Sequence, residues 1–105
     1  MGFFSLLFGT PDNKLLAETI NKGAFLVDVR SPREFSSGSV KGAVNIPLDS
    51  LTQQLAKFKG KENIVVFCRS GNRSSTAKSI LAQNGYPQVL DGGAWQDVNK
   101  ILTNQ

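Results

Sequence analysis

The chain has 105 residues, of which 40% are hydrophobic and 19% are charged, and its formal net charge is +4. This length suits one compact domain with a single core, so we expect residues 1–105 to form one domain. The chain contains no histidine and only one cysteine. Zinc sites with histidine ligands, Cys-His and Ser-His dyads, and an intramolecular disulfide are therefore excluded.

The sequence shows no sign of a membrane span, because no apolar run reaches the ~18–20 residues that a spanning helix requires. The apolar segment 1–9 lacks the basic region and the cleavage site of a secretory signal. We expect it to dock on the domain as a strand or a helical turn, with a trimmed signal as the alternative. A single cysteine disfavours a disulfide-stapled secreted scaffold, so we predict a cytoplasmic protein without a membrane partner. The basic cluster of Lys57, Lys59 and Lys61 is interpreted as a solvated loop, so no nucleic-acid partner is expected.

The first half of the chain predicts a helix, two strands and a second helix. Residues 13–21 carry apolar side chains at helical spacing and end before a glycine. Residues 24–29 are almost wholly apolar and β-branched, which is typical of a strand buried on both faces of a parallel sheet. Residues 44–46 predict a shorter strand. Within residues 48–58 the large apolar side chains recur at i, i+3, i+7 and i+10, which predicts an amphipathic helix.

The second half of the chain continues the alternation. Residues 64–67 predict another buried strand, followed by a loop from Cys68 to Arg73 and a helix that begins near Ser74. An Asn-Gly pair at 84–85 is expected to cap that helix.

A last strand and a last helix complete the predicted fold. Residues 88–90 predict a short strand, Gly92-Gly93 a turn, and the apolar stripe in 95–102 a helix. Strands that alternate with helices predict a three-layer α/β fold, with helices on both faces of a mostly parallel sheet.

Cys68 is the candidate reactive residue. A free cysteine is most often an inert buried side chain, but this one lies at the carboxyl end of a predicted strand, where parallel α/β sheets bind ligands. Backbone N–H groups of the following loop and the dipole of the next helix favour an anion there, and Gly71 permits the positive φ of a tight loop. With Arg69 and Arg73 nearby, we predict a lowered pKa for the Cys68 thiol, which then reacts without a histidine base.

Four blocks of the sequence resemble the rhodanese family in their order and spacing: residues 26–35, 38–47, 68–74 and 91–95. The resemblance covers about residues 25–102. It implies a rhodanese fold, with a mostly parallel sheet of four or five strands and helices on both faces. It also implies transfer of a sulfane sulfur as a persulfide on Cys68, with no metal and no organic cofactor.

The resemblance also implies roles for the residues around Cys68. The amide cradle and the contacts to a donor anion are assigned to Arg69, Ser70, Gly71, Asn72 and Arg73. Asp28 and Arg30 resemble the polar pair that supports this loop, although a solvated strand end with a helix cap is an equally good interpretation. Glu34 is expected on a helix surface and Trp95 in the core. Ser39 replaces a histidine common in the family, a change that we interpret as structural.

Two functions remain open from the sequence. The first is an enzyme that moves sulfur from thiosulfate or another small anionic donor to cyanide or a thiol, which must be external because there is no second cysteine. The second is a persulfide carrier in a protein-to-protein relay, with a thioredoxin-like or other sulfur-relay partner. A phosphatase or arsenate reductase is disfavoured because four residues, not five, separate Cys68 from Arg73. A silent interaction module is disfavoured by the presence of Cys68. The oligomeric state is not predicted.

Overall fold

The computed structural model describes residues 13–104, so the expectation for residues 1–9 lies outside the described residues. Its centre is a parallel sheet of four strands in the order β2-β1-β3-β4. The strands are β1 (Phe25–Asp28), β2 (Val44–Asn45), β3 (Ile64–Cys68) and β4 (Leu90–Ala94). The prediction of a mostly parallel sheet is confirmed, and the described residues supply four strands.

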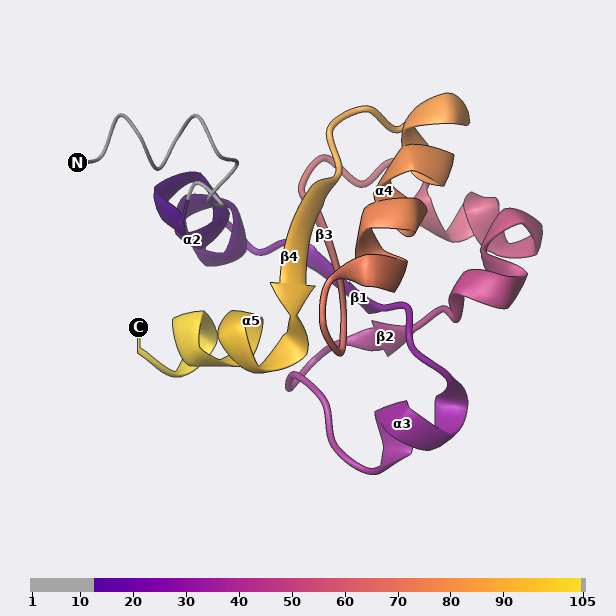
Figure 1. Cartoon of the computed structure of the whole chain (residues 1–105). Helices are drawn as coiled ribbons and strands as arrows, with labels where there is room; N and C mark the ends of the chain where they lie inside the picture. The colour runs from indigo at the N-terminus through magenta and orange to yellow at the C-terminus, as the bar shows by residue number, and fades with distance from the viewer. Residues whose placement is uncertain (1–12, 105) are drawn as a thin grey trace.

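Helices cover both faces of the sheet (Figure 1). Two of them, α2 (Asn13–Asn21) and α5 (Trp95–Thr103), pack on one face, while η1 (Leu48–Phe58) and α4 (Asn72–Gln83) pack on the other. The short helix α3 (Pro32–Ser36) follows the carboxyl end of β1. No helix among residues 13–104 has the length and the apolar character that a bilayer span requires.

The central strand β3 shares its side chains between two cores. All five of its residues are buried, and alternate side chains point to opposite faces of a strand. Ile64, Val66 and Cys68 join the core beneath η1 and α4, whereas Val65 and Phe67 join the core beneath α2 and α5. The strand's alternation therefore places the Cys68 side chain on the α4 side of the sheet.

The expected turn at Gly92-Gly93 is wrong, because both residues lie inside β4. The register pairs Phe67 with Gly93 and leaves Gly92 as an extra residue, so β4 carries a bulge there. A Cβ atom on Gly92 would lie 2.7 Å from Val98 Cγ2. This glycine is therefore needed for the close packing of α5 against the sheet. The strand predicted at residues 88–90 begins at Leu90 instead.

Two helices also differ from expectation. The segment Leu48–Phe58 is a 3-10 helix, interrupted by a non-helical residue at Gln54, rather than a regular α-helix. Helix α4 begins at Asn72, two residues earlier than predicted, because Gly71 at its N-cap has a φ of +102° and turns the chain sharply into the helix. The loop after Cys68 is consequently shorter than the predicted segment.

Candidate active site

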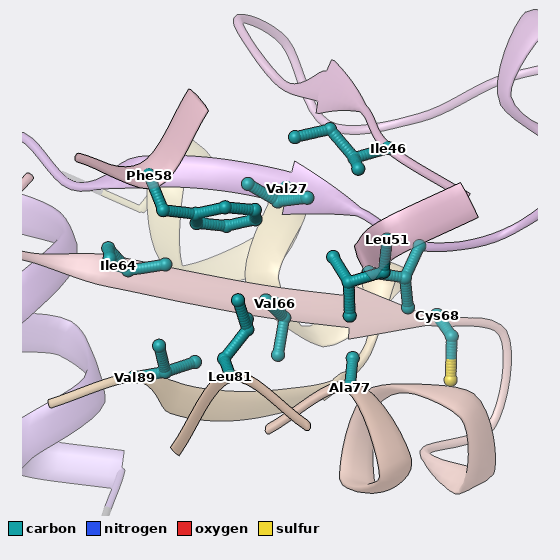
Figure 2. Packing of buried hydrophobic residues seen from close by; sticks show 11 residues of the cluster. Val27, Ile46, Leu51, Phe58, Ile64, Val66, Cys68, Ala77, Leu81 and Val89 are labelled. Atoms are coloured by element: carbon teal, nitrogen blue, oxygen red, sulfur yellow. The ribbon is translucent and has the colours of Figure 1, made fainter. Parts of the chain in front are cut away.

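Cys68 ends β3, and its sulfur is directed toward the helix that carries Ala77, which is α4 (Figure 2). The residue is only 1% exposed. Three residues, Arg69 to Gly71, connect the strand to the helix. The Cys68 sulfur therefore lies buried among the strand end, a tight loop and the first turn of α4.

The sulfur of Cys68 is surrounded by hydrogen-bonding groups of that turn. The backbone N–H of Gly71 donates to Sγ at 3.0 Å, and the backbone N–H of Ser74 donates to it at 3.4 Å. The thiol itself donates to the hydroxyl oxygen of Ser74 at 3.5 Å. Backbone N–H groups aimed at one atom from a helix N-terminus form an anion site, which suits a thiolate or a persulfide.

The pKa of Cys68 reflects two opposing effects. Burial raises the pKa of the thiol, while hydrogen bonds from the Ser74 hydroxyl and from the backbone N–H groups of Ser74, Gly71 and Ser70 lower it. The hydrogen bonds prevail, so the pKa of Cys68 lies below its ordinary value. The site thus favours the nucleophilic form of cysteine without a basic side chain.

The two arginines of the predicted loop are placed differently. Arg69 is exposed, as are Ser70 and Asn72. Arg73 instead binds Glu34 of α3 in a bidentate ion pair, with Nη1 at 2.6 Å from Oε1 and Nη2 at 3.0 Å from Oε2. Glu34 is therefore more than the surface helix residue that we expected, since it joins α3 to the first turn of α4.

The Glu34–Arg73 pair alters the pKa of both partners. The hydrogen bonds from Arg73, followed by one from the Ser31 backbone, lower the pKa of Glu34 to about 2. The hydrogen bond with Glu34 raises the pKa of Arg73. Glu34 also forms a capping box with Ser31, which fixes its position at the start of α3. Both side chains of the pair are therefore charged at any physiological pH.

Asp28 and Arg30 form a buried polar cluster beside β3. Asp28 is 0% exposed and Arg30 is 4% exposed, so the interpretation as a solvated strand end is wrong. Arg30 Nη2 lies 2.7 Å from Asp28 Oδ2 and also donates to the carbonyl oxygen of Gly38 at 2.6 Å. The Arg30 guanidinium lies over the ring of Trp95, 5.1 Å from its centroid.

The same cluster shows what Ser39 does. Its hydroxyl donates to Asp28 Oδ2 at 2.7 Å. Asp28 also pairs with Phe67 in the sheet, one residue before Cys68. The role of Asp28 and Arg30 as supports of the loop remains a prediction, but their position beside β3, the strand that ends at Cys68, is compatible with it.

Two residues of the site, Ser74 and Glu34, were not assigned to it from the sequence. Ser74 directly follows the predicted loop, and its partnership with Cys68 depends on helix α4 beginning early. Glu34 could have been placed by its capping-box spacing to Ser31, but its contact with Arg73 spans 39 residues. Among residues 13–104 no group of three or more Cys, His, Asp or Glu side chains is arranged to hold a metal ion.

Comparison with known proteins now assigns the family. The profile of the Rhodanese-like domain matches residues 12–97. The chain belongs to this family. It is 35% identical over 74 residues to the thiosulfate sulfurtransferase PspE of Escherichia coli, covering 69% of this chain and 71% of PspE. It is 32% identical over 91 residues to the thiosulfate sulfurtransferase GlpE of Shewanella oneidensis, covering 83% of this chain and 90% of GlpE.

The solved structures agree with the family assignment. The human single-domain sulfurtransferase TSTD1 superimposes with a TM-score of 0.67 at 28% identity, covering 82% of this chain and 89% of TSTD1. The rhodanese fold and the class of rhodanese-type transferase, both predicted from the sequence, are confirmed by these relatives. The chain spans 64% of the length of a mitochondrial relative from Schizosaccharomyces pombe.

Proposed function

We propose that this rhodanese domain transfers a sulfane sulfur through a persulfide on Cys68. Thiosulfate or another anionic donor supplies the sulfur, and cyanide or a thiol accepts it. One observation carries the proposal: Cys68 Sγ accepts hydrogen bonds from the N–H groups of Gly71 and Ser74 at the start of α4. This cradle stabilises negative charge on sulfur, which both the thiolate and the persulfide carry.

The proposed transfer has two balanced steps. In the first, the Cys68 thiolate attacks the outer sulfur of thiosulfate; an S–S bond forms to Sγ, the S–S bond of thiosulfate breaks, and its electron pair leaves with sulfite. In the second, an acceptor thiolate or cyanide attacks the outer sulfur of the persulfide. The new S–S or S–C bond forms, the bond to Sγ breaks, and its electron pair returns to Cys68 as the thiolate. No external oxidant or reductant is needed.

Arg69 is the side chain that we propose for the donor anion. It directly follows Cys68 and is exposed, so its guanidinium is available to the sulfonate end of thiosulfate. Arg73 was expected to share this task, but its guanidinium is bound to both carboxylate oxygens of Glu34. We therefore assign Arg73 to holding the loop, while the backbone N–H groups of Gly71 and Ser74 donate hydrogen bonds to the sulfur.

The ion pair between Arg73 and Glu34 supports a second candidate, a persulfide carrier in a protein relay. With Arg73 engaged by Glu34, the site devotes less positive charge to a small dianion than the loop sequence suggests. A protein donor, or a thioredoxin-like acceptor, would bind through a wider surface and depend less on a single arginine. The chemistry at Cys68 is identical in both candidates. The rate with thiosulfate relative to a protein persulfide distinguishes them.

Intact mass spectrometry tests the proposal directly. The protein is incubated with thiosulfate and compared with the Cys68→Ser variant, whose hydroxyl stays protonated at neutral pH. We expect one added sulfur on the wild type, removed by cyanide or a thiol, and none on the variant. An unmodified wild type with thiosulfate and also with a protein persulfide would refute the proposal. The cytoplasmic location and the single-domain organisation remain predictions.

A further inference from the structure

Ser74 lies buried beside the sulfur of Cys68, with its side chain on the inner face of the first turn of α4. The residue is 0% exposed. Its hydroxyl oxygen is 3.5 Å from Cys68 Sγ and 3.2 Å from the carbonyl oxygen of Gly71. Among residues 13–104, the other hydrogen bonds to this sulfur come from backbone N–H groups. Ser74 thus supplies the side-chain hydroxyl nearest the reacting atom.

A hydroxyl has one proton, so Ser74 cannot donate to both neighbours at once. In the thiol state, Cys68 donates to Ser74 Oγ and Ser74 donates to the carbonyl of Gly71. Once the thiol loses its proton, a negative sulfur would face a lone pair of the same oxygen. Rotation of the hydroxyl toward the sulfur replaces that repulsion with a charge-assisted hydrogen bond. The Gly71 carbonyl is not left unpaired, because it also accepts from the Ser75 backbone N–H at 3.1 Å.

We propose that Ser74 is a further catalytic residue, whose hydroxyl turns from the Gly71 carbonyl to Cys68 Sγ whenever that sulfur carries the negative charge. The proposal rests on the persulfide function proposed above. Negative charge appears on Sγ in the thiolate that attacks the donor, and again in the thiolate that is regenerated on Cys68 when the acceptor takes the outer sulfur. In that second step the S–S bond breaks, the electron pair stays on Sγ, and Ser74 donates a hydrogen bond without transferring its proton.

A hydrogen bond from the Ser74 hydroxyl has a large effect on the Cys68 sulfur, because this sulfur is buried and carries negative charge during the reaction. Burial raises the pKa of Cys68, and the hydroxyl of Ser74 is the largest of the effects that lower it again. A thiol of lower pKa is also a faster leaving group in sulfur exchange. Ser74 should therefore assist both the formation of the nucleophile and the release of the transferred sulfur.

The test compares Ser74→Ala with Ser75→Ala, which changes an exposed serine on the same turn. The alanine at 74 keeps the two backbone donors to Sγ and removes only the hydroxyl. We expect the pH midpoint of Cys68 alkylation by iodoacetamide to rise by roughly one to two units in Ser74→Ala and to stay unchanged in Ser75→Ala. Ser74→Thr, which keeps a hydroxyl, should restore the midpoint.

Rapid-mixing kinetics supply a second measurement, whose result would not change if Ser74 had only a structural role. Raising the pH should restore persulfide formation from thiosulfate in Ser74→Ala, because the thiolate then forms. Discharge of the persulfide to cyanide should remain roughly threefold to tenfold slower than in the wild type. This factor assumes that the rate depends on the pKa of the leaving thiol with a Brønsted slope similar to that of thiol exchange. An unchanged alkylation midpoint, or discharge that recovers fully with pH, would overturn the proposal. Alkylation needs no sulfur donor, so it still reports on Ser74 if the wild type forms no persulfide.

Discussion

Replacing Asp28 by asparagine should strongly destabilise the domain, because the change removes one charge of a buried ion pair. The Asp28 carboxylate is 0% exposed and lies 2.7 Å from Arg30 Nη2. It also accepts hydrogen bonds from the backbone N–H and Nε of Arg30, both at 3.0 Å, and from Ser39. Asparagine has nearly the same shape, so packing is kept while the guanidinium of Arg30 loses its countercharge.

The size of the effect follows from burial. Removing one partner of a buried pair typically costs about 3–5 kcal/mol, and the amide oxygen still accepts a hydrogen bond, which favours about 3 kcal/mol. A domain of this size has a total stability of about 5–15 kcal/mol. At about 4–8 °C per kcal/mol, the melting temperature should fall by roughly 12 °C or more.

Urea unfolding followed by circular dichroism measures this loss, with Asp97→Asn as the control. Asp97 is an exposed acid in the first turn of α5, so its neutralisation should cost about 1 kcal/mol or less. A loss below about 1 kcal/mol in Asp28→Asn would refute the argument from the buried pair. The alkylation rate of Cys68 under native conditions shows separately whether this pair supports the loop: a slower rate in the folded variant indicates that it does.

Three further predictions concern Arg69 in the loop after Cys68, the bulge at Gly92, and the ion pair between Glu34 and Arg73. Arg69→Ala should lower kcat/KM for thiosulfate by roughly tenfold to a hundredfold, the cost of one charge-assisted contact, while the exposed Arg33→Ala should not; steady-state assays measure this. Gly92→Ala should cost about 1–3 kcal/mol in denaturant titrations, because the added Cβ would lie 2.7 Å from Val98 Cγ2 and 3.0 Å from Val65 Cγ1. Glu34→Gln should cost about 1 kcal/mol or less near neutral pH, because the pair is partly exposed.

The pH dependence of the Glu34 contribution has a definite sign. The pKa of this carboxyl is lowered from 4.5 to about 2 in the folded state. Its stabilising effect is therefore complete above about 4.5 and is lost as the pH falls through about 2, where wild type and Glu34→Gln should converge. A difference between them that grows on acidification contradicts this assignment.

Each of the other two substitutions has its own contradicting result. Unchanged thiosulfate turnover in Arg69→Ala would favour the protein relay over the small-anion enzyme. A Gly92→Ala variant as stable as the wild type would mean that α5 can move away from the bulge at little cost, contrary to the close packing around Val98.

The alternation of strands with helices, the cover of helices on both faces of the sheet and the place of Cys68 at the end of a buried strand could all be predicted from the sequence. Buried β-branched runs such as residues 64–67 are unambiguous in an α/β alternation, and a cysteine after such a run, before a glycine loop and a helix, can occupy only the strand end. The resemblance of four separated blocks to one family then made the rhodanese class predictable. These features depend on the local sequence pattern, which can be recognised without knowing the tertiary contacts of each residue.

The pairing of the polar side chains could not be predicted from the sequence, because it depends on contacts between distant segments. The position of Arg73 in the sequence predicted a contact with the sulfur donor. Arg73 instead binds Glu34, 39 residues away, because α3 approaches the first turn of α4. The burial of Asp28 and Arg30 depends on Ser39 and Trp95, which neighbouring segments bring to them. Gly92 looks like a turn residue until α5 packs against it. A side chain's partner is set by which elements meet, and that meeting is a property of the whole fold.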